Sequence, residues 1–224
     1  GSGFVASFPQ PGGNVTGFWS EGDEGLIGKR LELLKDAVPS VSEIGFIVNP
    51  EDTADVNALS SLPAVSHALG LGVRVLEVRT AAELQMAFAA AERERLQALH
   101  ISQSPLFNSH RSEIAAMALG ARLPAVYGFR EFALAGGLIS YATSLPHTYR
   151  QLAIFVDKIL KGANPADLPI ERASKFELVI NLKTAKAMEL EQNFTIIAQL
   201  TADRLAVINR RYLTTPLAPA ISFA

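Results

Sequence analysis

The first six residues carry the pattern with the most obvious chemistry. Gly1, Gly3 and Ala6 have the spacing G-x-G-x-x-A, the turn that brings the pyrophosphate of a dinucleotide against a helix N-terminus. This turn functions only between a strand and a long helix. No strand stands ahead of Gly1, and Pro9 and Pro11 follow too soon for a long helix. We therefore expect no dinucleotide and no other cofactor.

Nucleophiles and metal ligands are also sparse. Ser20 lies between Gly17 and Gly22 in a stretch one residue too long for the G-x-S-x-G nucleophile elbow. Cysteine is absent, which excludes thiol nucleophiles and Cys-ligated metals. No histidine pair has H-x-x-x-H or H-E-x-x-H spacing, and no nucleophile, base and orienting group can be assembled. We expect no metal site, no catalytic residues and a protein that is not an enzyme.

Around these motifs, short apolar runs alternate with helical patterns. The apolar runs predict strands at 44–48, 73–78, 98–102, 124–127, 138–141 and 176–180. Helical patterns lie between them, among them 53–69, which ends at Gly70, and 146–161, which ends at Gly162. Strands that alternate with helices and are apolar throughout are typical of a parallel, doubly wound sheet. The predicted fold class is therefore α/β.

Ligands of such a sheet bind at the carboxyl ends of its strands. The candidate ligand contacts at or near those ends are Asn49, Ser102, Gln103, Ser104, Tyr127, Phe129 and Tyr141. Ser102 and Ser104 lie beside a predicted helix N-terminus, whose N–H groups favour a carboxylate or another anion. The three aromatic residues are expected to cluster and could stack a planar or apolar ligand; core packing would explain each of them as well.

Composition narrows the class of protein further. The 224 residues have a net charge of −2, with 49% hydrophobic and 19% charged residues, and their mean hydropathy is +0.21. This length allows one to two folded domains, and this composition excludes disorder. Because no basic excess is present, we expect no nucleic-acid partner. No apolar run reaches the ~20 residues of a membrane span.

Several longer stretches resemble one family, the substrate-binding proteins of bacterial ABC importers in the tryptophan/tyrosine-type group. The matching stretches are PGGNVTG at 11–17, GKRLELLK at 28–35, SPLF at 104–107, LPAVYGFREF at 123–132, AGGLISY at 135–141, VDKILKGANPADLP at 156–169 and KFELVINLKTAKA at 175–187. Together they extend over residues 1 to about 190.

The resemblance implies the type I periplasmic-binding-protein fold, in which two α/β lobes joined by crossovers close on a small ligand. It assigns 1–15 to a linker or crossover, 16–128 to the second, C-terminal lobe, 129–168 to a return segment of the first lobe and 169–190 to a crossover back. Residues 191–224 match the family poorly and are expected to form a divergent tail. The motif at 127–131 would lie at a crossover, with cleft and hinge residues.

The resemblance also implies a function without chemistry. The protein would bind a small organic solute, an aromatic amino acid or a related acid, between its lobes in the periplasm and present the closed form to an ABC permease. An alternative is a ligand-sensing module of a regulatory or signalling protein, since such lobes are reused that way. Family members carry a signal sequence and more of the first lobe. Without that part, apolar surface on the return segment 129–168, including Leu152 and Phe155, is expected to be exposed, and the chain is expected to associate or to bind ligand weakly.

Overall fold

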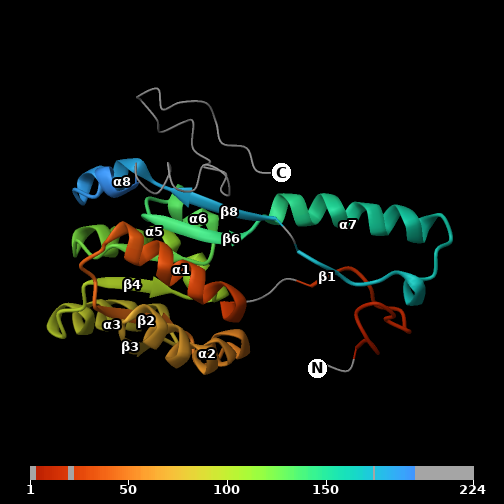
Figure 1. Cartoon of the computed structure of the whole chain (residues 1–224), viewed down its shortest axis with the longest axis horizontal. Coiled ribbons are helices and arrows are strands. Elements are labelled where there is room, and N and C mark those ends of the chain that lie inside the picture. The colour runs from red at the N-terminus through yellow and green to blue at the C-terminus, as the bar shows by residue number, and fades with distance from the viewer. Residues whose placement is uncertain (1–3, 20–22, 174, 195–224) are drawn as a thin grey trace. The chain divides into compact units, whose positions relative to one another are not determined.

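The computed structural model describes residues 4–19, 23–173 and 175–194, and these form two compact units (Figure 1). Unit 1 comprises the described residues within Gly1–Glu21 and Thr143–Phe176; unit 2 comprises those within Gly22–Ala142 and Glu177–Ala224. Along the chain, unit 2 gives way to unit 1 between Ala142 and Thr143. Residues 130–142 stay with unit 2 because the strand they lead into pairs with its sheet. Gly1, Gly3 and residues 195–224 of the predicted tail lie outside the described residues.

Unit 2 is built on a six-stranded sheet with the order β3-β2-β4-β5-β6-β8. The strands are β2 (Glu43–Val48), β3 (Gly72–Glu77), β4 (Ala98–Ile101), β5 (Ala125–Tyr127), β6 (Ile139–Thr143) and β8 (Phe176–Ile180). Strands β2 to β6 pair in parallel, and Ile101 lies opposite Ile47 on one side and Tyr127 on the other. The α/β class and the positions of the strands are confirmed.

The last strand departs from the predicted parallel sheet. Strand β8 is the neighbour of β6 at the sheet edge. Backbone hydrogen bonds join Ser144 N–H to Lys175 O and Asn181 N–H to Leu138 O, so residue numbers rise along β6 as they fall along β8. The two strands are antiparallel, a common arrangement for one edge of an otherwise parallel sheet.

Helices cover both faces of this sheet (Figure 1). On one face pack α1 (Asp23–Ala37), α2 (Thr53–Leu69) and α8 (Leu182–Ala187), and on the other α3 (Ala81–Arg93), α4 (Pro105–Ser109), α5 (Arg111–Gly120) and α6 (Arg130–Leu134). Consecutive strand residues alternate between the two cores: Phe46 belongs to the first and Ile47 to the second. Burial of apolar strands on both faces is what fixes the doubly wound layering.

Helix α2 shows how the sequence sets the ends of an element next to the candidate site. Its N-cap is Asp52, whose side chain accepts a hydrogen bond from the Ala54 N–H at 3.0 Å. It ends at Gly70, which has a φ of +62° and donates its N–H to His67 O. This left-handed conformation favours glycine, so the predicted end of the helix is confirmed.

Unit 1 is smaller. It holds β1 (Phe18–Trp19), α7 (Leu145–Leu160), the 3-10 helix η1 (Pro165–Asp167) and β7 (Glu171–Arg172), and β1 pairs in parallel with β7. Phe155 of α7 packs edge-on against Phe18 with ring centroids 5.3 Å apart. Phe155 is 4% exposed, so the prediction of an exposed Phe155 is wrong. In the described part of the chain, no helix is long and apolar enough to cross a membrane.

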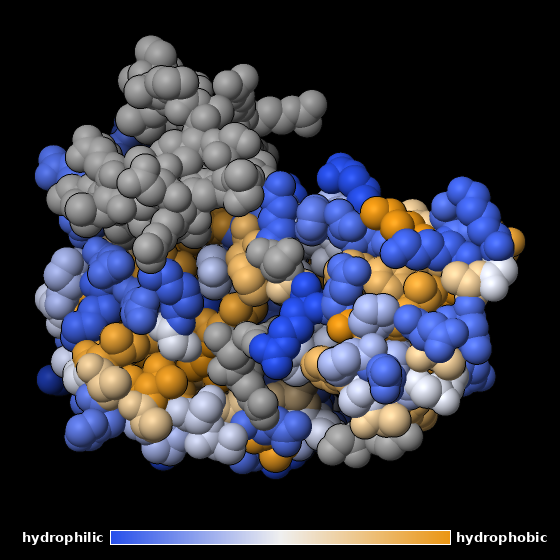
Figure 2. Space-filling model, turned by 45° about the vertical axis from the view of Figure 1, so that its right-hand side comes forward, coloured by the Kyte–Doolittle hydropathy of each residue, from blue (hydrophilic) through white to orange (hydrophobic). Residues whose placement is uncertain are grey.

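Other apolar side chains of α7 are exposed. They are Leu145, Tyr149, Ile154, Val156, Ile159 and Leu160, of which Leu160 is 82% exposed. Hydrophobic residues are accordingly visible among hydrophilic ones at the right of the space-filling view (Figure 2). Tyr149, Val156 and Leu160 are spaced by seven and four residues, which places them on one face of the helix.

Candidate functional site

The residues that follow three neighbouring parallel strands meet at one edge of the sheet of unit 2. We call this the carboxyl edge and define it as residues 49–55 after β2, 102–105 after β4 and 128–130 after β5. The register places Ile47, Ile101 and Tyr127 side by side, so the residues after them leave the sheet together. As the sequence predicts, Asn49, Ser102, Gln103 and Ser104 lie at this edge.

Asp55, in the first turn of α2, links two of these loops. Its Oδ2 accepts the backbone N–H of Asn49 at 2.8 Å and the hydroxyl of Ser102 at 2.5 Å. Asp55 is 1% exposed and Ser102 is fully buried. Hydrogen bonds to a carboxylate are roughly twice as strong as neutral ones, so the loops after β2 and β4 are held together. The Ser102 hydroxyl donates to Asp55, and Ser102 therefore helps to hold the loop after β4 in place.

Ser104 extends this network. Its hydroxyl accepts a hydrogen bond from Asn49 Nδ2 at 3.4 Å, and its carbonyl accepts the N–H of Asn108 as α4 begins. Ser104 is fully buried, whereas Asn49 is partly exposed. The structure thus brings together Asn49, Ser102 and Ser104, which the sequence placed on two separate loops. Of these three, Asn49 is the one whose side chain is partly exposed.

Gln103 connects the second loop with the third. Its Nε2 donates to the carbonyl of Gly128, and its side chain passes so close to Gly128 that a Cβ there would overlap it. Gly128 is required for this close approach rather than for a positive φ, since its φ lies outside the left-handed region. Gln103 is partly exposed, and Phe129 beside Gly128 is also partly exposed. These two side chains are available at the surface of the carboxyl edge.

Tyr127 is a core residue at the end of β5. Its ring is fully buried and stacks on Phe132 with centroids 4.5 Å apart and planes 13° apart. Burial raises the pKa of the Tyr127 phenol far above its usual value of about 10. The phenol oxygen has no hydrogen-bond partner among the described residues. Tyr127 therefore packs in the core next to the carboxyl edge, and its side chain is not exposed there.

Tyr141 lies on the other face of the sheet. It packs against the core of α1 and α2, whereas Tyr127 and Phe129 pack against the core of α3 to α6. The expected cluster of three aromatic side chains is therefore wrong. Tyr141 is half-buried; burial raises the pKa of its phenol, and its carbonyl accepts the Nε–H of Arg30 at 2.8 Å. Tyr127 lies opposite Ser140, so the next residue, Tyr141, faces the opposite way.

Sequence reasoning missed Asp55, which organises the edge. Its position three residues after the N-cap Asp52 is a weak signal, because acidic residues are common in the first turn of a helix. What distinguishes Asp55 is burial beside Ser102, 47 residues away in the sequence. A pattern in sequence alone does not show such a contact.

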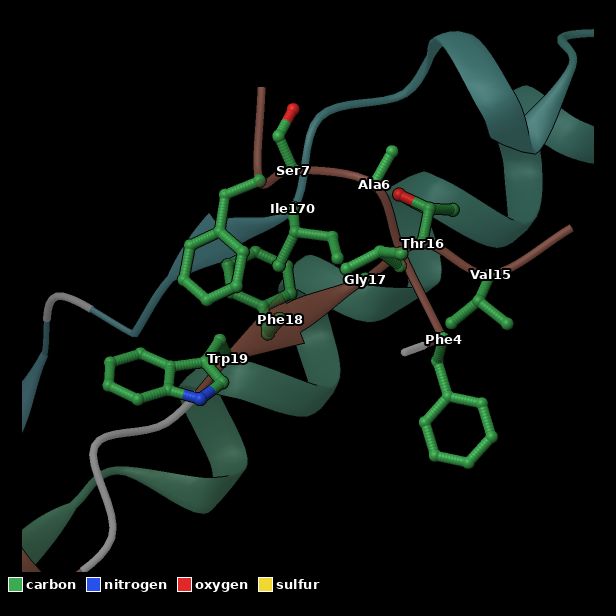
Figure 3. Close-up of a pocket in the computed structure, with 11 residues that line it drawn as sticks. Phe4, Ala6, Ser7, Val15, Thr16, Gly17, Phe18, Trp19 and Ile170 are labelled. Atoms are coloured by element: carbon green, nitrogen blue, oxygen red, sulfur yellow. The ribbon is translucent and has the colours of Figure 1, made fainter. Parts of the chain in front are cut away.

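Unit 1 holds a pocket of its own, with a volume of about 460 Å³ (Figure 3). Aromatic and aliphatic side chains dominate its wall, which is formed by Phe4, Val5, Ala6, Ser7, Phe8, Val15, Thr16, Gly17, Phe18, Trp19 and Ile170. Phe8 lies 5.6 Å from Trp19 between ring centroids, and the Arg172 guanidinium lies 5.3 Å from the Trp19 centroid. The Thr16 hydroxyl donates to Leu168 O at 2.6 Å, so this polar group is already engaged within the unit.

Comparison with known proteins identifies the family. A family model described as ABC transporter substrate binding protein matches residues 1–202. The chain belongs to this family. The resemblance found in the sequence motifs is thereby confirmed.

Relatives of this chain agree with the family assignment. A tyrosine-binding protein of Clostridioides difficile (strain R20291) is 27% identical over 214 residues, which are 92% of this chain and 57% of that protein. An ABC domain from Streptococcus pneumonia, solved in complex with L-Trp, has a TM-score of 0.70 at 23% identity and covers 83% of this chain and 63% of that one. A conserved domain protein from Vibrio cholerae O1 biovar El Tor has a TM-score of 0.74 at 24% identity, covering 85% and 64%.

The two solved structures establish that this chain has their fold. The chain spans 57% to 64% of the length of these three relatives. The family is one of binding proteins. At the carboxyl edge, the contacts that the structure shows are hydrogen bonds between neighbouring loops. No group of histidine and carboxylate side chains able to hold a metal occurs in the described ranges.

Proposed function

We propose that this chain forms the greater part of a solute-binding protein of an ABC importer and that it binds a small organic solute at the carboxyl edge of unit 2. The observation that carries this proposal is the network in which Asp55 holds the loops after β2 and β4. That network fixes the edge in one arrangement, so Asn49 and Gln103 present polar groups in a preset geometry. Preset polar groups lower the entropy cost of binding a small ligand.

The two units correspond, in this proposal, to the two lobes of the fold. Unit 2 is the second lobe, and unit 1 is part of the first. Closure of the lobes on the solute would be a hinge motion that includes the connections at 142–143 and 176–177. The closed form is what an ABC permease would recognise, and the protein would act in the periplasm and perform no chemistry.

The first solutes to test are aromatic amino acids. This choice is supported by the relatives, one described as a tyrosine-binding protein and one solved with L-Trp. It is also supported by the partly exposed ring of Phe129 at the carboxyl edge, which offers an apolar surface beside the amide of Gln103. An aromatic amino acid has both an apolar ring and the charged groups that such amides bind.

Calorimetric titration of the 224-residue chain tests the proposal. The ligands are L-tryptophan, L-tyrosine, L-phenylalanine, L-leucine and L-glutamate. Saturable binding of at least one aromatic amino acid supports it. Binding of L-leucine or L-glutamate alone contradicts the aromatic assignment, and binding of none contradicts the function.

A pair of glutamine variants tests the location. Gln103→Ala removes an amide at the carboxyl edge and should weaken binding. Gln97→Ala is the matched control, because Gln97 lies at the opposite edge of the sheet, where its Oε1 accepts the N–H groups of Ser42 and Glu43. Equal effects of the two substitutions would contradict the location.

A further inference from the structure

Strand β3 ends beside β2, so the residues after β3 extend the carboxyl edge of unit 2 by one strand. The register pairs Val48 with Glu77, and the Val78 N–H donates to Val48 O at 2.9 Å. The two strands therefore stay paired up to the point where both end. Asn49 follows Val48, and Arg79 follows Val78. Because adjacent strands lie about 4.8 Å apart, the backbone of Arg79 leaves the sheet near that of Asn49.

Hydrogen bonds to α3 fix the turn that carries Arg79. Glu83, in the first turn of this helix, accepts the Arg79 N–H at Oε2 over 2.8 Å and the Thr80 hydroxyl at Oε1 over 3.2 Å. The bond from the Arg79 N–H lowers the pKa of the Glu83 carboxyl, so this carboxylate stays charged at neutral pH. The backbone of Arg79 is thus held in place, while its side chain is exposed.

The guanidinium of Arg79 is held by an exposed ion pair. Its Nη2 lies 2.6 Å from Oε2 of Glu77, and the two side chains are 47% and 50% exposed. Such a pair contributes little to stability, because water screens the attraction and both long side chains lose freedom. Arg130, the cation after β5, is more enclosed: its side chain is 25% exposed, beside Glu177 at 9%. Of these two cations, Arg79 is the one that can exchange its partner for a solute with little loss.

The proposed solutes carry an anion that matches this cation. L-Tryptophan and L-tyrosine each have an α-carboxylate, and a guanidinium binds a carboxylate through two parallel N–H···O bonds. The partly exposed residues already described at the carboxyl edge, Asn49, Gln103 and Phe129, are uncharged. A contact with Arg79 would therefore add charge recognition to the polar and apolar contacts that these three side chains offer.

We propose that Arg79 is a binding residue of the carboxyl edge, whose guanidinium leaves Glu77 and pairs with the carboxylate of the bound solute. The inference rests on the proposed function, and it narrows the solute to a carboxylic acid. Glu77 opposes binding, because its carboxylate competes with the solute for the same N–H groups. The assignment concerns unit 2 by itself.

Amino acids and their amides distinguish a carboxylate contact from other effects. L-Tryptophanamide and L-tyrosinamide keep the ring and the ammonium group of the amino acid and replace its carboxylate with a neutral amide. Calorimetric titration of the 224-residue chain with each acid and its amide gives the ratio of the two dissociation constants, which measures the preference for the acid. We expect Arg79→Gln to lower this preference about tenfold, the effect of losing one charge-assisted hydrogen bond.

Arg74→Gln is the matched control. Arg74 lies in the first half of β3, away from the carboxyl edge, and its Nε forms an ion pair with Glu94 at 2.9 Å. Its side chain is 60% exposed, so the substitution removes the same charge from the same strand at another exposed position. The preference for the acid should stay unchanged. An equal loss in the two variants would show a general effect of net charge and overturn the assignment.

Glu77→Gln tests the exchange from the other side of the ion pair. Without the competing carboxylate, Arg79 is free for the solute, and the preference for the acid should rise about threefold. This variant also keeps the proposal testable if circular dichroism shows that Arg79→Gln does not fold. A preference that Glu77→Gln leaves unchanged or lowers would overturn the exchange.

The outcomes separate this assignment from the proposed function. If the chain binds L-tryptophan or L-tyrosine and Arg79→Gln keeps the full preference for the acid, the assignment is overturned and the function stands. The same holds if the unsubstituted chain binds the acid and its amide equally well. If the chain binds neither amino acid, the proposed aromatic function fails in its own titration, and the assignment fails with it.

Discussion

The imidazole ring of His100 lies face to face with the phenyl ring of Phe46, with centroids 4.2 Å apart and planes 3° apart. Both residues are fully buried, on the neighbouring strands β4 and β2. Neither ring nitrogen of His100 has a hydrogen-bond partner among the described residues. Burial holds the pKa of His100 well below its usual value, and the charge of Arg30 lowers it further.

This stacked pair makes stability depend on pH. The unfolded chain takes up a proton on His100 below about pH 6.5, while the folded chain does not until a much lower pH. The unfolded state then binds more protons, so the free energy of unfolding falls as the pH drops below about 6.5, by at most ~1.4 kcal/mol per pH unit for this group. His100→Phe should remove this part of the slope in urea unfolding between pH 7.5 and 5. His67→Phe, at an exposed position, is the control, and an equal change in both variants would contradict the assignment.

Removal of the Asp55 carboxylate should lower the free energy of unfolding, because two hydrogen-bond donors use it as their acceptor. Asp55→Ala leaves the Asn49 N–H and the buried Ser102 hydroxyl without their acceptor, and we expect the free energy of unfolding to fall by about 3 kcal/mol. Asp52→Ala, in the same turn, removes only the N-cap bond to Ala54 and should cost about 1 kcal/mol. Urea unfolding followed by circular dichroism gives both values. The account fails if Asp52→Ala costs as much as Asp55→Ala.

Gly137 should not tolerate a side chain. A Cβ at this position would lie 2.6 Å from Cε2 of the buried Tyr127 ring and 2.9 Å from the carbonyl oxygen of Phe132. Gly137→Ala should therefore destabilise unit 2 by about 2 kcal/mol. Gly120→Ala meets no atom within 4 Å and should stabilise α5 by about 0.5 kcal/mol. Thermal unfolding distinguishes the two; a stable Gly137→Ala variant would show that Tyr127 is free to move.

The exposed apolar face of α7 should cause the chain to associate. Tyr149, Val156 and Leu160 are 68%, 55% and 82% exposed on one face of this helix. Sedimentation of the 224-residue chain should show a mass that rises with concentration, and Val156→Lys with Leu160→Glu should restore the monomer. Met86→Glu replaces a single residue of α3 that is 71% exposed and should change nothing. A monomer at all concentrations would contradict this prediction.

Much of unit 2 is determined by local sequence. The apolar runs and the helix-ending Gly70 define strands and helices because hydrophobic periodicity and backbone conformation act over a few residues. The carboxyl edge can also be predicted, since Asn49 directly follows one predicted strand of the parallel sheet and Ser102 ends another. The family motifs place the same elements in the same order, and residues 1–202 match the family.

What only the tertiary structure decides is the contact between segments far apart in the chain. Asp55 reaches Ser102 across 47 residues, and Arg130 reaches Glu177 across the same number. Strand register places Tyr127 opposite Ser140 and so turns Tyr141 to the other face, because side chains alternate along a strand and a shift of one residue exchanges the faces. The reversal of β8 likewise depends on which neighbour the returning chain pairs with. Such contacts are set by packing and register between elements. They therefore cannot be predicted from residue patterns within one element.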